Sequence, residues 1–427
     1  MKKNVKIKTY ESGARVITET DKTAPYLVFA MFVHTGSNHE MPEEFGVAHF
    51  LEHMMFKSCK DYTTQEISEK LESLGARINA WTSEETTCYY FKCLPECFED
   101  CAKIYSNMLQ FPLFLEDEFN HEKNVILEEI ASDEDSPQYS TFLSTYVAFL
   151  SNFVPNAHNV AAKAENVKRL TSQNLRNFMD KHYVGKNLIF SVIGNIESGK
   201  SEEIIEKYFQ QIINKKSCQE VPSQPMPLVV QSNVVNLEKD TKQVKLYIFI
   251  KTANLESPKR DAVRVLNRIL GGGMSSRLFS EIRTKRGLAY SIHSSVGLIG
   301  NLGNMSISAG IAPDNLSQAL MAIKTVLKDL AENGVTEDEL SKAKVQIQSA
   351  YAFSVENRAV IMEGNASDLR YYGDVFSDEH VLAKINAVTA EDVQEAAKQI
   401  YFEPITVIGV SGQNLDKEIL EKFLIKD

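Results

Sequence analysis

The chain has 427 residues, of which 43% are hydrophobic and 24% charged, and its formal net charge is −11. This length exceeds what one ordinary hydrophobic core supports, so we expect a globular protein of at least two domains. The acidic balance argues against nucleic acid and membrane surfaces as partners, and the absence of a signal peptide or a long apolar run leads us to expect a cytoplasmic protein.

Strand-like and helix-like patterns alternate through the first half of the chain. Thr63 and Glu66 form a capping-box pattern that predicts the start of a helix, and Gly75 predicts its end. Residues 133–137 have the composition of a loop. In chain order, the patterns predict strands at 5–18, 26–34, 77–82, 86–94 and 188–193, and helices at 46–56, 63–74, 95–109, 115–130, 139–153, 171–183 and 202–211.

The helix at 46–56 contains the pattern His49-x-x-Glu52-His53. Two histidines four residues apart project from one helix face about one turn apart, so both imidazoles can reach one metal ion. Zinc binds imidazole nitrogen readily, and a catalytic zinc site uses three protein ligands and a water. The alternative is a chance pattern on a half-buried helix, and a third ligand is needed to decide.

The helix at 115–130 offers carboxylates for that role. Glu122 and Glu129 are seven residues apart and therefore share a helix face, whereas Glu128 points about 100° away from Glu129. Glu129 follows His53 by 76 positions. The alternative for each acid is a solvated helix face, and we prefer it for Glu128.

A polar, proline-bearing segment at 214–227 separates the first half from a second run of similar patterns. In the second run, strands are expected at 244–250 and within 287–311, and helices at 261–270, 316–332 and from Thr336 onward. The repeat predicts two copies of one domain, at 1–213 and 228–427. The second copy has Asn267, Arg268 and Ala350 where the first has metal-site residues, so we expect one metal site per chain.

Two further groups of residues carry chemistry. Arg283 and Tyr290 are seven apart in the segment EIRTKRGLAYSI, which without other information predicts a basic turn followed by a strand with a buried Tyr. Cys93, Cys97 and Cys101 recur every four residues. A second metal site there is conceivable, but free cysteines are usually small buried hydrophobes.

The His49–His53 pattern and the spacing to Glu129 resemble those of the pitrilysin/insulinase metallopeptidases, the inverzincins. The match is to the short two-domain branch that includes the mitochondrial processing peptidase beta subunit and bacterial relatives, and it covers nearly the whole chain. The resemblance implies that His49, His53 and Glu129 bind Zn²⁺. It also implies that Glu52 is the general base and that Glu122 orients a ligand.

The resemblance assigns roles to the remaining residues as well. Arg283 and Tyr290 would reach from the second domain to the substrate and to the oxyanion. Asn79 and Ala80 would lie on a strand edge that binds the substrate as an added strand. One departure is residues 154–160, where the short-branch relatives usually carry a stretch rich in glycine and proline.

The implied fold class is α+β: two homologous α/β roll domains, each a mixed sheet packed with helices, arranged as a clamshell. The implied function is zinc-dependent endopeptidase activity on peptides or unfolded protein segments, and we expect a homodimer. One alternative is an inactive partner or assembly subunit of the same family. Another is an unrelated fold in which the pattern binds a structural metal.

Overall fold

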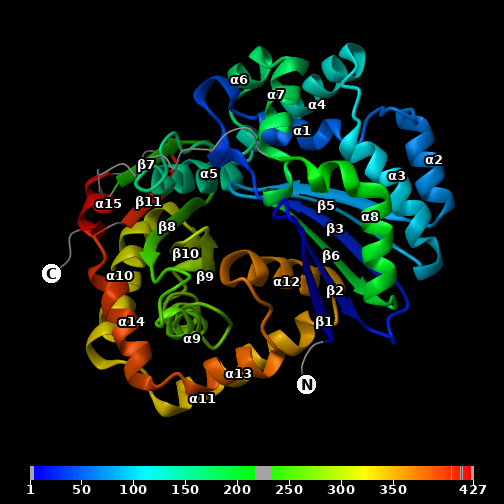
Figure 1. Cartoon of the computed structure of the whole chain (residues 1–427). Coiled ribbons are helices and arrows are strands. Elements are labelled where there is room, and N and C mark those ends of the chain that lie inside the picture. Colours follow the sequence, from blue (N-terminus) through cyan, green and yellow to red (C-terminus); the bar gives the residue numbers. More distant parts are fainter. Residues whose placement is uncertain (1–3, 217–232, 405, 414, 416, 425–427) are drawn as a thin grey trace. The chain divides into compact units, whose positions relative to one another are not determined.

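The computed structural model describes residues 4–216, 233–404, 406–413, 415 and 417–424 (Figure 1). These residues form two compact units, each assembled from three segments of the chain. Unit 1 contains the described residues of 4–131, 158–216 and 352–379, and unit 2 contains those of 132–157, 233–351 and 380–424. Each unit therefore includes a segment from the opposite half of the sequence, whereas the expected domains, 1–213 and 228–427, are continuous. Most of the expected linker, 214–227, lies outside the described residues.

Unit 1 is built on a six-stranded mixed sheet with the order β1-β2-β6-β3-β5-β4. Neighbouring strands are antiparallel except for the parallel pair β2 and β6. All seven residues of β3 (Leu27–Val33) are buried, as expected for a strand that is covered on both faces. The other strands are β1 (Val5–Thr9), β2 (Arg15–Thr20), β4 (Arg77–Thr82), β5 (Thr87–Cys93) and β6 (Leu188–Gly194).

Both faces of this sheet are covered, and alternate residues of β3 point to opposite sides. Phe29 and Met31 join the larger core, which includes residues of most of the helices of unit 1. Val28 and Phe32 join a smaller core with α12 (Arg358–Tyr372), a helix from the second half of the sequence (Figure 1). The other helices are α1 (Val47–Met54), α2 (Thr64–Ser73), α3 (Phe98–Gln110), α4 (Glu116–Asp135), α6 (Ala164–Arg169), α7 (Ser172–His182) and α8 (Ser198–Asn214).

Unit 2 is built on a five-stranded mixed sheet with the order β7-β11-β8-β10-β9. One core forms where six of the unit's helices meet the sheet. A second core forms where α5 (Pro137–Leu150), a helix from the first half of the sequence, packs against Phe249 and Val407. The strands are β7 (Asn233–Glu238), β8 (Val244–Thr252), β9 (Ala289–Ile299), β10 (Leu302–Ile311) and β11 (Thr406–Gly412). The helices are α9 (Arg260–Leu270), α10 (Leu316–Asn333), α11 (Glu337–Ser354), α13 (Asp378–Ala387), α14 (Ala390–Phe402) and α15 (Lys417–Leu424).

The two sheets share one topology. Apart from β1, the first sheet runs β2-β6-β3-β5-β4 and the second runs β7-β11-β8-β10-β9, and in each only the first pair is parallel. The expected α+β class, with two similar mixed sheets packed with helices, is confirmed. Within the described residues, no helix is both long and apolar enough to cross a membrane.

Two local predictions were wrong. Residues 5–18 form a hairpin rather than one strand, because the turn between β1 and β2 contains Gly13 at φ 91°, a conformation that favours glycine. Residues 133–137 are not a loop, because α4 continues to Asp135 and α5 begins at Pro137. Only Ser136 lies between these helices, and its side chain accepts a hydrogen bond from the backbone N–H of Tyr139.

Candidate metal centre

Helix α1 carries the His49-x-x-Glu52-His53 pattern, and its beginning is held by side chains from elsewhere in unit 1. Gly46 precedes the helix at φ 90°. The carboxylate of Glu40 accepts hydrogen bonds from the backbone N–H groups of Gly46 (2.7 Å) and Ala48 (2.8 Å). These groups have no partner inside a helix, and a carboxylate there also interacts favourably with the helix dipole.

His158 completes this arrangement. Its Nε2 lies 2.7 Å from Oε2 of Glu40, and its ring stacks on Phe45 with the centroids 3.7 Å apart. His158 belongs to the 154–160 segment that departs from the family pattern, so this segment contacts the start of the metal helix. Neither Glu40 nor His158 was predicted from the sequence, because their pairing spans 118 positions.

His49, His53 and Glu129 come together in unit 1. Their ligand atoms all lie within 4.8 Å of one another, and this is the one such group of His, Cys, Asp or Glu among the described residues. Oε2 of Glu129 is 3.9 Å from Nε2 of His49 and 3.7 Å from Nε2 of His53. Those separations are too long for hydrogen bonds. They approach the roughly 3.4 Å expected between two ligands that bind one tetrahedral zinc ion at about 2.0–2.1 Å, so the donor set fits zinc.

Glu122 fixes the orientation of His53. Oε1 of Glu122 accepts a hydrogen bond of 2.9 Å from Nδ1 of His53, which leaves the Nε2 lone pair free for a metal. Nζ of Lys57 lies 2.5 Å from the other oxygen of Glu122. Burial raises the pKa of Glu122, but the hydrogen bonds from His53 and Lys57 outweigh burial and hold that pKa at about 2. The side chain is 8% exposed, so the alternative of a solvated helix face does not apply to Glu122.

The two imidazoles differ in their electrostatic surroundings. Burial lowers the pKa of His49 to about 3, with a further contribution from His53, so His49 is neutral at pH 7 as a metal ligand must be. Burial also lowers the pKa of His53, but the hydrogen bond to Glu122 and the charges of Glu52, Glu122 and Glu129 outweigh it, and the net shift is upward. Three carboxylates around two imidazoles therefore favour a bound cation.

Helix α4 reaches this site with one acidic face. Glu118 precedes Glu122 by four residues and Glu129 by eleven, which places all three on the same side of the helix. Glu118 accepts hydrogen bonds from the hydroxyls of Ser58 (2.6 Å) and Thr64 (2.7 Å), in the segment that follows α1. Glu118 thus anchors the start of α4. The four-residue spacing from Glu122 was a signal for it that the sequence analysis did not use.

Glu52 lies on α1 between the two histidines, and the structure gives it a partner that the sequence analysis missed. Thr82, the last residue of β4, donates a hydrogen bond of 2.5 Å from its hydroxyl to Oε2 of Glu52. Burial raises the pKa of Glu52, and the Thr82 hydrogen bond opposes that rise. Asn79 and Ala80 lie on the same strand, which is the last strand of its sheet.

The remaining sequence candidates lie elsewhere. Arg283 and Tyr290 meet in unit 2, where the Arg283 guanidinium lies 5.8 Å from the centre of the Tyr290 ring. Cys93 and Cys101 are buried, and Cys97 is half-buried. The three cysteines do not form a three-ligand group of the kind found at His49, His53 and Glu129 among the described residues.

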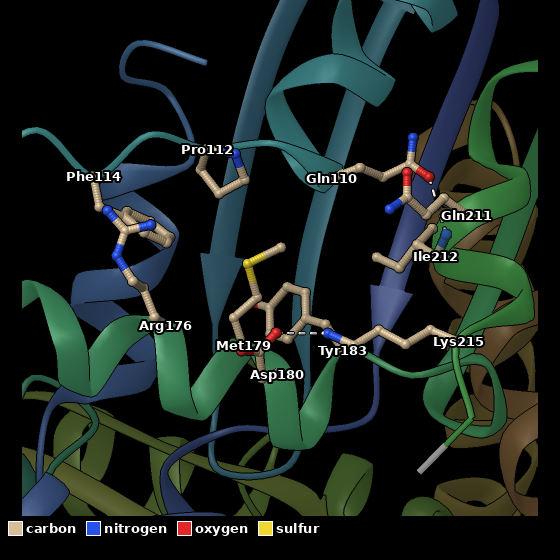
Figure 2. Close-up of a pocket in the computed structure, with 10 residues that line it drawn as sticks. All are labelled: Gln110, Pro112, Phe114, Arg176, Met179, Asp180, Tyr183, Gln211, Ile212 and Lys215. Atoms are coloured by element: carbon tan, nitrogen blue, oxygen red, sulfur yellow. Dashed lines mark hydrogen bonds and ion pairs between the residues drawn. The ribbon is translucent and has the colours of Figure 1, made fainter. Parts of the chain in front are cut away.

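Unit 1 also contains a cavity of about 380 Å³ that carries none of these residues (Figure 2). Its charged groups are already engaged. Lys215 pairs with Asp180 at 2.9 Å, and the guanidinium of Arg176 stacks on Phe114 with its carbon 5.1 Å from the ring centre. The cavity therefore does not compete with the metal centre as the candidate site.

The model of the insulinase family, peptidase family M16, matches residues 15–157, and the model of the peptidase M16 inactive domain matches residues 169–347. An uncharacterized zinc protease of Streptomyces coelicolor is 30% identical over 399 residues, which cover 92% of this chain and 86% of that protein. The chain belongs to the insulinase family. A second relative, the uncharacterized zinc protease YmxG of Bacillus subtilis, is 30% identical over 96% of this chain and 99% of its own length.

Solved structures agree with the insulinase-family fold. A protease from Helicobacter pylori superimposes with a TM-score of 0.86 at 21% identity, over 96% of this chain and 99% of that one. A peptidase M16 inactive domain from Pseudomonas fluorescens gives a TM-score of 0.85, also at 21% identity and with the same coverage. At this identity the likeness establishes the fold.

Proposed function

We propose that this insulinase-family protein is a zinc-dependent metalloendopeptidase that cleaves peptides and extended protein segments. The observation that carries the proposal is the convergence of His49, His53 and Glu129, with Glu52 on the same helix as the two histidines. Relatives named as zinc proteases support the choice of metal.

His49, His53 and Glu129 would hold the ion. Zinc bound there would lower the pKa of a water molecule and polarise the peptide carbonyl. The carboxylate of Glu52 would accept a proton from a water molecule and pass it to the leaving amine nitrogen. Glu122 accepts the hydrogen bond from Nδ1 of His53, so Nε2 would be free to hold the ion.

Unit 2 supplies the groups that grip the substrate in this proposal. Tyr290 is 73% exposed, which removes the alternative of a strand Tyr packed in the core. Arg283 is also exposed and lies 4.8 Å from the ring centre of Phe279. A guanidinium offers several fixed donors to peptide carbonyls, and a phenol can donate to an oxygen that gains negative charge.

The free edge of β4 is the proposed binding strand for the peptide. The side chain of Asn79 accepts a hydrogen bond of 2.9 Å from the backbone N–H of Ala80. A bound peptide would replace that local contact with a main-chain carbonyl, as in other cases of strand addition. This mode of binding selects extended segments over folded domains.

The alternative is an inactive partner or assembly subunit of the same family. Metal analysis, followed by digestion of an unbiased peptide library, separates the two, with Glu52→Gln as the control. The proposal predicts about one zinc per chain and hydrolysis that the control lacks. A zinc-free chain, or equal hydrolysis by both proteins, would overturn it. The homodimer and the cytoplasmic location stay part of the proposal, to be tested by light scattering and by cell fractionation.

A further inference from the structure

Thr82 is the last residue of β4, the proposed peptide-binding strand, and it contacts Glu52, the proposed base. Alternate residues of a strand share a face, so Ile78, Ala80 and Thr82 point to the same side of β4. Ile78 and Ala80 pack against the larger core, which contains buried residues of α1, whereas Trp81 packs against the smaller core with α12. The hydroxyl of Thr82 is therefore directed to the side of the sheet that carries the metal helix.

The hydrogen bond from Thr82 engages one of the two oxygens of Glu52. The distance from Oγ1 to Oε2 is 2.5 Å, which is short and typical of a hydroxyl that donates to a carboxylate. Among the described residues, no other hydrogen bond reaches the Glu52 carboxylate. Oε2 is thus occupied by the hydroxyl proton, and Oε1 stays available to accept a proton from water.

The backbone around Thr82 holds that hydroxyl in place. Thr82, on the edge strand β4, pairs with Thr87 on the neighbouring strand β5. The turn between these strands closes with a hydrogen bond of 2.8 Å from the N–H of Ser83 to the carbonyl of Thr86. The N–H of Ser37 donates to the carbonyl of Ser83 at 3.2 Å, and the N–H of Asn38 donates to the carbonyl of Glu84 at 2.8 Å. Because these hydrogen bonds fix the turn, the Thr82 hydroxyl limits the rotation of the Glu52 carboxylate.

We propose that Thr82 is a positioning residue that aims the carboxylate of Glu52, an inference that rests on the proposed peptidase function. The strand that offers its edge to the peptide then also sets the direction of the base. A peptide paired with Ala80 has a fixed register relative to Thr82, two residues further along. The structure in this way couples the alignment of the substrate to the alignment of the proton acceptor.

The test compares Thr82→Val, which keeps the branched shape and removes the hydroxyl, with Thr82→Ser, which restores it. We expect Thr82→Val to keep its zinc and its KM and to lose about 10- to 100-fold in kcat, because the bond is made to a charged group. Thr82→Ser should return kcat to within about threefold. Thr87→Val is the matched control: Thr87 lies directly opposite in register, and its hydroxyl donates to the Thr35 carbonyl at 2.9 Å. We expect its kcat to be unchanged.

Two further measurements separate positioning from a general structural role. In a Glu52→Gln background, Thr82→Val should cause no additional loss, because Thr82 acts through Glu52. In crystal structures, Thr82→Val should show a rotated Glu52 carboxylate on an unmoved α1. An unchanged carboxylate, a full additional loss in the double variant, or an equal loss in Thr87→Val would each overturn the inference. If the wild-type protein cleaves no peptide, the proposed function fails, and the crystal structures still decide whether Thr82 orients Glu52.

Discussion

Two helix pairs hold corresponding places in the two units: α1 with α4 in unit 1, and α9 with α11 in unit 2. The starts of α4 and α11 share the sequence Glu-Asp-Glu, which matches Glu118 to Glu339. Glu122 and Glu129 then match Ala343 and Ala350. Of the three acids on this face of α4, one therefore has an acidic counterpart in unit 2 and two have none.

The acid present in both units accepts hydrogen bonds from side chains near the neighbouring helix in each unit. Glu118 accepts hydrogen bonds from side chains next to α1, and Glu339 accepts hydrogen bonds of 2.7 and 2.8 Å from Arg277. The two acids that unit 2 lacks are those that face the histidines in unit 1. In unit 2, Arg268 donates to Gln346 at 2.7 Å instead. The comparison separates residues that hold the helix pair together from residues that could bind a metal.

The largest expected effect comes from cutting the chain into residues 1–213 and 228–427. The first piece lacks α12, which covers one face of its sheet, and the second lacks α5. We expect each piece alone to be inactive and poorly folded, and the mixture to recover peptidase activity. Circular dichroism and a peptidase assay on the pieces and the mixture are the measurements. Full activity of the first piece alone would contradict the prediction.

Glu129→Ala gives unit 1 the residue that unit 2 has at this place, Ala350. We expect the zinc content to fall from about one per chain to near zero, because one of three protein ligands is lost. Glu128→Ala is the matched control and should keep its zinc. Elemental analysis of both variants decides, and the opposite result would move the ligand to Glu128.

Glu52→Gln places an amide where unit 2 has the amide of Asn267. An amide accepts no proton under these conditions, so we expect hydrolysis to fall by about 10²–10⁴-fold with zinc retained. The measurements are kcat/KM and zinc stoichiometry on the same preparation. Turnover close to that of the wild type would show that another group is the base.

Glu122→Gln removes the negative charge that holds His53. We expect zinc affinity to weaken by about 10–100-fold, because partners that orient a metal ligand typically contribute this much. Glu118→Gln, on the same face of α4, is the control and should bind zinc like the wild type. Competition with a zinc chelator measures both variants, and equal affinities would argue that Glu122 does not act on the metal centre.

Glu339→Gln tests the structural half of the comparison. The hydrogen bond from Arg277 holds the pKa of Glu339 at about 2, below its ordinary value of 4.5. The ion pair therefore stabilises the fold above about pH 4.5 and loses its effect as pH falls toward 2. We expect the variant to be about 1–3 kcal/mol less stable at pH 7, with a smaller difference from the wild type at pH 3. Urea unfolding at both pH values is the measurement, and a difference that grows on acidification would contradict it.

The sequence predicted the parts of the site that depend on local spacing. The periods of helix and strand placed His49 and His53 on one face and gave β4 its observed bounds, Arg77–Thr82. Partners far apart in sequence, such as Lys57 for Glu122 and Thr82 for Glu52, leave no local pattern and were missed. The exchange of α5 and α12 between the units was missed for the same reason, because an apolar helix face does not specify which sheet it will cover.

The origin of α12 has a consequence for the order of events on the ribosome. The strand of the first sheet that is synthesised last, β6, ends at Gly194, whereas α12 ends at Tyr372. At typical synthesis rates of about 5–20 residues per second, roughly 10–40 s pass between these points. During that interval the sheet face carrying Val28 and Phe32 has no covering helix. The nascent chain would therefore expose an apolar sheet face, the kind of surface that chaperones bind, until α12 is synthesised.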